Sequence, residues 1–261
     1  GQFSYQRIGT AAFGPGLGFV IQAAVLCYTL LACVSFCVLL GDLVPDVIAD
    51  FTSEHGLFFR LLGSRETGLP ILGLLVLLPM SCARDLRHFQ HSSAVALSCD
   101  AIAAAIIILH FVTGSTDGAT SHAVRIAETV SWFHLDWTAV TTVPIVVVAA
   151  NSHYNAPRYY YELSGRTTQK IGVVIFRSLS VCSLVYVVVA ASGYLQFGEA
   201  TQGDIFLNYL SSKDPSATFG RTALAIHLAM TFPLIFNALR LAVHSLISPC
   251  RPQGIRFSWF H

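Results

Sequence analysis

The sequence has very little charge for its length. Asp, Glu, Lys and Arg make up only 11% of its 261 residues, whereas a soluble domain carries roughly 25%. Apolar residues make up 54%, and the mean hydropathy is +0.63. This shortage of charge argues against a soluble fold and predicts that lipid surrounds most of the molecule.

Motifs of soluble enzymes are also missing. The sequence has no Walker loop and no Cys-x-x-Cys pair. The segment Gly14-Pro15-Gly16-Leu17-Gly18 is not followed by a strand–helix unit, so we interpret it as a helix start where small residues let two helices approach closely. We interpret His88 and His91 as interfacial polar residues. The sequence therefore predicts no enzyme, no cofactor, no metal site and no nucleic-acid partner.

Six apolar stretches dominate the chain. About 20 helical residues span the hydrocarbon core of a bilayer, because a helix rises about 1.5 Å per residue. The stretches are apolar on every face and lack the alternation of barrel strands, which favours helices. We therefore expect an all-α polytopic membrane protein with about six transmembrane helices, at 17–41, 69–83, 92–113, 138–157, 171–197 and 217–247.

Lys and Arg are distributed unequally between the two sets of connecting segments. Eight lie before the first stretch, in 84–91 and 158–170, and after the last stretch. Only four lie in 41–68, 114–137 and 198–216. Because Lys and Arg favour cytoplasmic loops, the first set is predicted to be cytoplasmic.

The fourth stretch is the best candidate for a substrate site. Its apolar part, Thr138 to Ala150, is about 20 Å long as a helix, contains Pro144 and is followed by polar residues. A helix that breaks inside the membrane exposes main-chain dipoles that can bind a charged substrate. The alternative is a helix that simply ends before a cytoplasmic loop. The candidate substrate-binding residues are Val148, Ala149, Ala150, Asn151, Ser152 and His153.

Two further features can bind a coupling ion. Pro233 frees the carbonyl of Ala229, and the hydroxyl of Thr231 lies nearby, so this part of the sixth stretch offers hard oxygen ligands to Na+. The alternative there is a plain proline kink. Asp100 is the only acid inside a stretch, where its insertion costs about 2.5–3.5 kcal/mol. It is either a proton-coupling group or a structural partner of Arg84, Arg177 or a hydroxyl.

Short motifs along the whole chain resemble one family, the amino acid/auxin permeases (amino acid transporter transmembrane family), which includes sodium-coupled neutral amino acid transporters. The most specific block is Val143-Pro144-Ile145 through His153, followed by Tyr160-x-Glu162-Leu163. The other matching motifs are Ser4-Tyr5-Gln6, Ala12-Phe13-Gly14, Leu40 to Pro45, Leu78-Pro79, Gly193 to Gly198, Thr231-Phe232-Pro233 and Phe257-Ser258-Trp259.

This resemblance implies a leucine-transporter-like bundle of two inverted repeats, of which the chain supplies family helices 3–8. The chain is then a fragment that lacks family helices 1–2 and 9–11, its partners in the full-length protein. The family places substrate at the unwound sixth helix and sodium beside the eighth. The implied function is symport of amino acids with Na+ or H+ by alternating access, in the plasma membrane or a lysosomal or vacuolar membrane. The alternative is an amino acid sensor with little transport.

Overall fold

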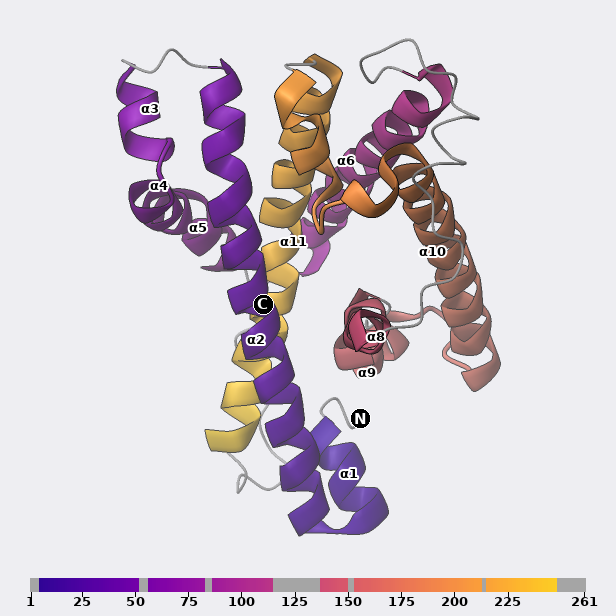
Figure 1. Cartoon of the computed structure of the whole chain (residues 1–261). Helices are drawn as coiled ribbons and strands as arrows, with labels where there is room; N and C mark the ends of the chain where they lie inside the picture. Colours follow the sequence, from indigo (N-terminus) through magenta and orange to yellow (C-terminus); the bar gives the residue numbers. More distant parts are fainter. Residues whose placement is uncertain are drawn as a thin grey trace. The chain divides into compact units, whose positions relative to one another are not determined.

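The computed structural model describes residues 5–51, 56–82, 86–114, 137–149, 153–212 and 215–247. All regular structure in these ranges is helical, which confirms the expected all-α class (Figure 1). The elements are α1 (Tyr5–Phe13), α2 (Pro15–Phe51), α3 (Leu57–Leu62), α4 (Arg65–Leu72), the π-helical η1 (Gly73–Leu77), α5 (Leu78–Cys82), α6 (Leu86–Thr113), α8 (Trp137–Ala149), the 3₁₀ turn η2 (His153–Asn155), α9 (Ala156–Glu162), α10 (Thr168–Phe197), and the 3₁₀ segments η3 (Gly198–Ala200) and η4 (Ile205–Ser212), followed by α11 (Pro215–Ile247).

Five helical segments of the described residues are long and apolar enough to cross a membrane: Pro15–Phe51, Arg65–Cys82, Ser92–Thr113, Thr168–Ala200 and Pro215–Ile247. They match five of the six expected spans. Within the fourth expected span, 138–157, the described elements are α8, η2 and α9, and residues 150–152 between α8 and η2 lie outside the described ranges. The first span also differs in extent, because α2 continues past residue 41 as far as Phe51.

The chain divides into two compact units, which we describe separately. The first comprises residues 1–35, 152–166 and 233–261, and the second comprises 36–151 and 167–232.

In the first unit, α1 and the start of α2 approach each other closely at glycines. Gly14 ends α1 with φ of +92°, a conformation that favours glycine, and Pro15 opens α2. A Cβ on Gly18 would lie 2.7 Å from the carbonyl oxygen of Gln6, and one on Gly9 would lie 3.1 Å from the Cα of Gly18. The prediction that small residues let two helices approach here is confirmed.

In the second unit, an apolar core joins α6, η4 and α11. Ala103, Ile106 and Ile107 of α6 are buried against Phe206 and Tyr209 of η4 and against Ala217 of α11. The Tyr209 hydroxyl donates to Gln196 Oε1 over 2.7 Å, so the buried phenol has a partner. This core fixes the connection between α10 and α11 against α6.

Polar contacts among the described residues also join α6 to α11. The hydroxyl of Ser92 donates to the carbonyl of Met230 over 2.9 Å, and His227 Nδ1 lies 3.0 Å from the carbonyl oxygen of Ala96. His110 Nε2 lies 2.6 Å from the hydroxyl oxygen of Ser216. Residue numbers rise along α6 as they fall along α11, so the two helices are antiparallel neighbours.

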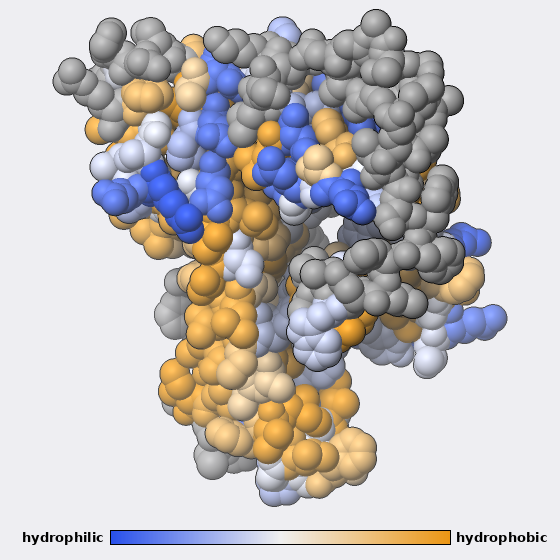
Figure 2. Space-filling model, viewed as in Figure 1, coloured by the Kyte–Doolittle hydropathy of each residue, from blue (hydrophilic) through white to orange (hydrophobic). Residues whose placement is uncertain are grey.

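The described surface is largely apolar. Large hydrophobic residues are exposed along α10, and none of the most apolar stretch of that helix is buried in the structure. Figure 2 shows hydrophobic side chains over much of the length of α2 and hydrophilic ones near its C-terminal turns. Such a surface is stable only against lipid or other transmembrane helices, which agrees with an integral, multi-pass membrane protein.

We expect Gly18→Ala to destabilise the protein and Gly16→Ala to leave it unchanged. The added methyl at Gly18 meets the backbone of α1, whereas a Cβ on Gly16 has no atom within 4 Å. Overpacking of this kind costs about 1–3 kcal/mol. Thermal unfolding of the full-length protein in detergent measures the difference, and equal melting temperatures for the two variants would contradict the close contact.

Candidate functional site

Helix α8 ends at Ala149. It has 13 residues, about 20 Å, and contains Pro144. The next described element, η2, begins at His153. The carbonyl of Ala149, in the last described turn of α8, accepts a hydrogen bond from another helix.

Only two of the six residues predicted to bind substrate lie in α8. Val148 and Ala149 form its last turn, with Val148 exposed. Ala150, Asn151 and Ser152 lie outside the described residues, as does the side chain of His153. The substrate-site assignment therefore stays a prediction.

A residue that the sequence reasoning missed contacts the end of α8. The hydroxyl of Tyr186, on α10, donates to the carbonyl oxygen of Ala149 over 3.3 Å. Nothing in the sequence distinguishes Tyr186 from the other tyrosines in apolar surroundings, because its role comes from the placement of α10 beside the end of α8.

The predicted proton-coupling residue, Asp100, lies on α6 and is half-buried. Helices α6 and α10 pack against each other. Asp100 makes no hydrogen bond or ion pair within the described residues. Of its predicted structural partners, Arg177 is exposed on α10 and Arg84 lies outside the described residues.

The predicted ion-binding residues lie on α11, one turn before Pro233. Ala229 and Pro233 are buried, and Thr231 is half-buried. Proline at 233 has no N–H to give to the carbonyl of Ala229. The hydroxyl of Ser92 reaches the neighbouring carbonyl of Met230, so α6 also brings an oxygen atom to this part of α11.

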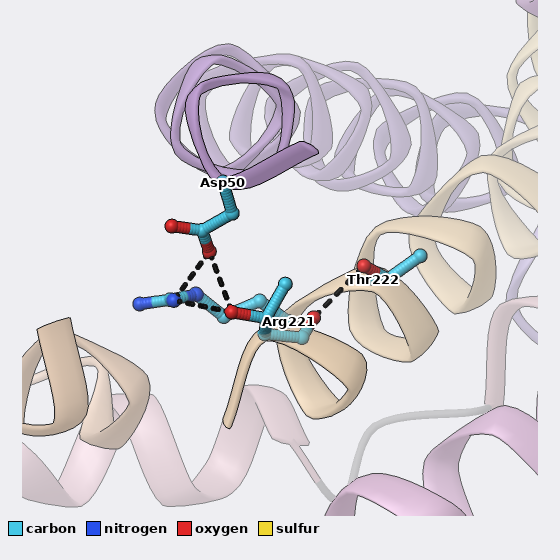
Figure 3. A network of polar contacts seen from close by, with 4 residues as sticks. Asp50, Arg221 and Thr222 are labelled. Carbon is cyan, nitrogen blue, oxygen red and sulfur yellow. Dashed lines mark hydrogen bonds and ion pairs between the residues drawn. The ribbon is translucent and has the colours of Figure 1, made fainter. Parts of the chain in front are cut away.

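An ion pair between the buried Arg221 and the partly exposed Asp50 joins the C-terminal turns of α2 to the start of α11 (Figure 3). Arg221 Nη2 lies 2.5 Å from Asp50 Oδ2, with side chains 1% and 28% exposed, and the hydroxyl of Thr218 donates to the same oxygen over 2.8 Å. Two nitrogens of Arg221, Nε and Nη1, have no hydrogen-bond partner among the described residues. Spacing gives a partial signal, since Asp42, Asp46 and Asp50 recur every fourth residue on one helix face.

Comparison with known proteins identifies the family. A model of the family described as transmembrane amino acid transporter protein matches residues 1–260. The chain belongs to this family. No solved structure matches it with comparable significance.

Similar proteins come from fungi, plants and animals. Vacuolar amino acid transporter 6 of Saccharomyces cerevisiae is 24% identical over 99% of the chain and 56% of its own length. Amino acid transporter AVT6A of Arabidopsis thaliana is 26% identical over 94% of the chain and 55% of its own length. Putative sodium-coupled neutral amino acid transporter 11 of Danio rerio is 29% identical over 90% of the chain and 50% of its own length. The chain thus spans about half the length of these relatives.

We expect Asp50→Ala to destabilise the protein strongly and Asp42→Ala to have little effect. Loss of Asp50 leaves the buried Arg221 without its carboxylate. Breaking a fully buried pair costs about 3–5 kcal/mol, and the cost here is lower because Asp50 is 28% exposed. Asp42, on the same helix as Asp50, pairs over 2.7 Å with Arg65 of α4. Both of these side chains are more than half exposed, and such pairs contribute about 0–1 kcal/mol.

The melting temperatures of the two full-length variants in detergent compare the contribution of the Asp50–Arg221 pair with that of the Asp42–Arg65 pair. Equal melting temperatures would show that Arg221 finds another partner when Asp50 is lost.

Proposed function

We propose that the protein carries amino acids across a membrane by secondary active transport, coupled to Na+ or H+ moving in the same direction. The observation that carries this proposal is the match of residues 1–260 to the transmembrane amino acid transporter family. The names of the relatives agree with it, since they include vacuolar and putative sodium-coupled amino acid transporters. A vacuolar or plasma membrane is the corresponding location.

The end of α8 supplies groups suited to a zwitterion. A helix carries a partial negative charge at its C-terminus, so the carbonyls of Val148 and Ala149 attract the α-ammonium of an amino acid. The main chain up to Asn151 binds the remaining charged main-chain group of the substrate. Asn151, Ser152 and His153 then select among substrate side chains.

Two places on the chain suit a coupling ion. The carbonyl of Ala229 and the hydroxyl of Thr231 are hard oxygen ligands of the kind that Na+ prefers. The carboxylate of Asp100 suits H+ and lies on a membrane-spanning helix, where an ionisable side chain is expensive and usually functional.

The mechanism that fits these sites is alternating access, in which one group of helices rocks against the other around a midplane site. Ion binding favours the outward-open state, and binding of the amino acid together with the ion closes the outer gate. A ligand shifts such an equilibrium only through its different affinity for the two states. Helix ends that change partners during rocking supply that difference. The family helices outside this chain and the bilayer complete the transporter.

We expect Asn151→Ala in the full-length protein to reduce amino acid uptake about tenfold or more. Asn151 follows the end of α8, and a lost hydrogen bond to a charged substrate group costs about 1.5–3 kcal/mol. Uptake of radiolabelled amino acids into proteoliposomes measures the loss. Gln202→Ala is the control, because that side chain is exposed between η3 and η4. Normal uptake by Asn151→Ala would contradict the assignment of the substrate site. If the unmodified protein binds amino acids but does not transport them, it is a sensor.

We expect Thr231→Ala to abolish uptake or to raise the sodium concentration that half-maximal uptake requires, because the variant removes one oxygen ligand of the ion. Thr222→Ala on the same helix is the matched control, since its hydroxyl donates to the carbonyl of Thr218 over 2.8 Å. Uptake measured against sodium concentration and pH separates the two coupling ions. If uptake by Thr231→Ala depends on sodium concentration and pH as it does in the unmodified protein, the assignment of an ion site on α11 is wrong.

A further inference from the structure

Helix α6 brings a hydroxyl group to the turn of α11 that carries the predicted ion-binding residues. The hydroxyl of Ser92 donates to the carbonyl of Met230 over 2.9 Å. On α11, Met230 stands between Ala229 and Thr231, the two residues predicted to bind a coupling ion. The contact therefore places an oxygen atom of α6 at the same turn of α11 as both of them.

A second contact fixes this placement. One turn further along α6, the carbonyl oxygen of Ala96 lies 3.0 Å from His227 Nδ1. The two contacts are four residues apart on α6 (96 minus 92) and three residues apart on α11 (230 minus 227), which is about one helical turn on each. The register of the two helices, and with it the position of the Ser92 oxygen, is set by both contacts together.

The direction of the hydrogen bond leaves the oxygen of Ser92 able to bind a cation. A hydroxyl group has one hydrogen and two lone pairs. The carbonyl of Met230 takes the hydrogen, so the lone pairs of the Ser92 oxygen remain available. Hydrogen bonds in a chain polarise one another, so an oxygen that donates its hydrogen is also a better electron donor to a cation.

Two oxygen atoms of α11 are available at the same turn. Pro233 has no N–H, so the carbonyl of Ala229 lacks the donor that a regular helix would provide. The hydroxyl of Thr231 makes no hydrogen bond among the described residues, whereas that of Thr222 on the same helix donates to the carbonyl of Thr218. Helices α6 and α11 thus bring three oxygen atoms to one turn.

We propose that Ser92 is a ligand of the coupling ion, together with the carbonyl of Ala229 and the hydroxyl of Thr231, and that this ion is Na+. This inference rests on the proposed transport function and specifies which ion drives it.

The chemistry of the three oxygens selects a metal cation over a proton. Hydroxyl and carbonyl oxygens are neutral, hard ligands, which hold a cation such as Na+ through its charge. A carboxylate, which would take up a proton, is not part of this set. Helix α11 contains no Asp or Glu, and the acid of α6, Asp100, lies eight residues past Ser92, about 12 Å along the helix.

An ion shared by two helices also has a consequence for the transport cycle. Ca²⁺ and Mg²⁺, which are hard cations like Na+, take about six or more oxygen ligands. Helices α6 and α11 supply three, and water or parts of the protein outside the described residues supply the others. A ligand favours the arrangement that it binds more tightly, so Na+ favours the arrangement in which α6 and α11 are in contact at Ser92.

The test is the thermal stabilisation of the full-length protein in detergent by NaCl, with choline chloride replacing NaCl at constant ionic strength. We expect Na+ to raise the melting temperature of the unmodified protein until the site is saturated. Ser92→Ala removes one oxygen ligand, so we expect half-maximal stabilisation at an Na+ concentration about tenfold higher. Ser92→Thr keeps a hydroxyl and is expected to retain the sodium dependence of the unmodified protein.

A second substitution covers the case in which Ser92→Ala does not fold. Ser92→Cys keeps a weak donor for the carbonyl of Met230 but replaces the hard oxygen by a soft sulfur. We expect it to need a higher Na+ concentration, as Ser92→Ala does. An unchanged sodium dependence in Ser92→Cys would contradict the proposal.

Two controls separate an ion ligand from a structural contact. His227→Phe breaks the neighbouring contact between α6 and α11 but removes none of the three oxygens, so we expect a lower melting temperature with unchanged half-saturation by Na+. Ser98→Ala is the matched serine control, because the hydroxyl of Ser98 donates to the carbonyl of Ala94 on its own helix over 2.9 Å. We expect it to respond to Na+ as the unmodified protein does.

Three results would overturn the inference while leaving transport intact. They are amino acid uptake without any effect of Na+ on the melting temperature, an unchanged half-saturation in Ser92→Ala, and an equal change in His227→Phe. Uptake of radiolabelled amino acids into proteoliposomes, with and without Na+, is measured in parallel. Absence of uptake under both conditions would contradict the proposed function, whereas a sodium response that depends on Ser92 would still identify the ion site.

Discussion

The hydrocarbon core of a bilayer offers no water to backbone N–H and C=O groups, and this constraint governs the whole chain. A long helix without proline such as α10 meets it by pairing its backbone groups internally. The places where pairing stops are therefore the informative ones. Helix α8 ends after 13 residues, and Pro233 takes a donor from α11. Unpaired main-chain groups at such places are tolerated only where other protein groups, water or a ligand can reach them. Here the hydroxyl of Tyr186 donates to the carbonyl of Ala149 in α8, and the hydroxyl of Ser92 donates to the carbonyl of Met230, next to Ala229 in α11.

Polar side chains inside the second unit serve mainly to hold helices in register. The contacts from Ser92 and Ala96 of α6 to α11 are one turn apart on both helices, so they form successive steps of one antiparallel seam. A seam of polar contacts restricts sliding more than apolar packing does, because a one-turn shift leaves each donor without its acceptor. The carbonyl of Ala229 lies between the two steps, so this seam holds the predicted ion-binding part of α11 firmly against α6.

The sequence predicted the helical class and five of the spans, because length and apolar composition suffice for that. It also located the close approach of helices at Gly18, since small residues have a direct steric meaning. It did not predict the pairing of Asp50 with Arg221, which are 171 residues apart, or the contact of Tyr186 with Ala149. Both depend on which helices are neighbours, and apolar periodicity carries no such information when every face of a helix is apolar. Pro144 and the polar residues after Ala150 suggested that a helix ends near Ala150. The groups from other helices that lie beside this helix end could not be predicted.

The two carboxylates at Asp50 and Asp100 differ in the partners that they have among the described residues. Asp50 accepts from Arg221 and Thr218, so neutralising it would leave a buried guanidinium unpaired. Asp100 makes no hydrogen bond or ion pair among the described residues. Asp50 therefore holds α2 and α11 together, whereas Asp100 makes no such link in the described part of the chain.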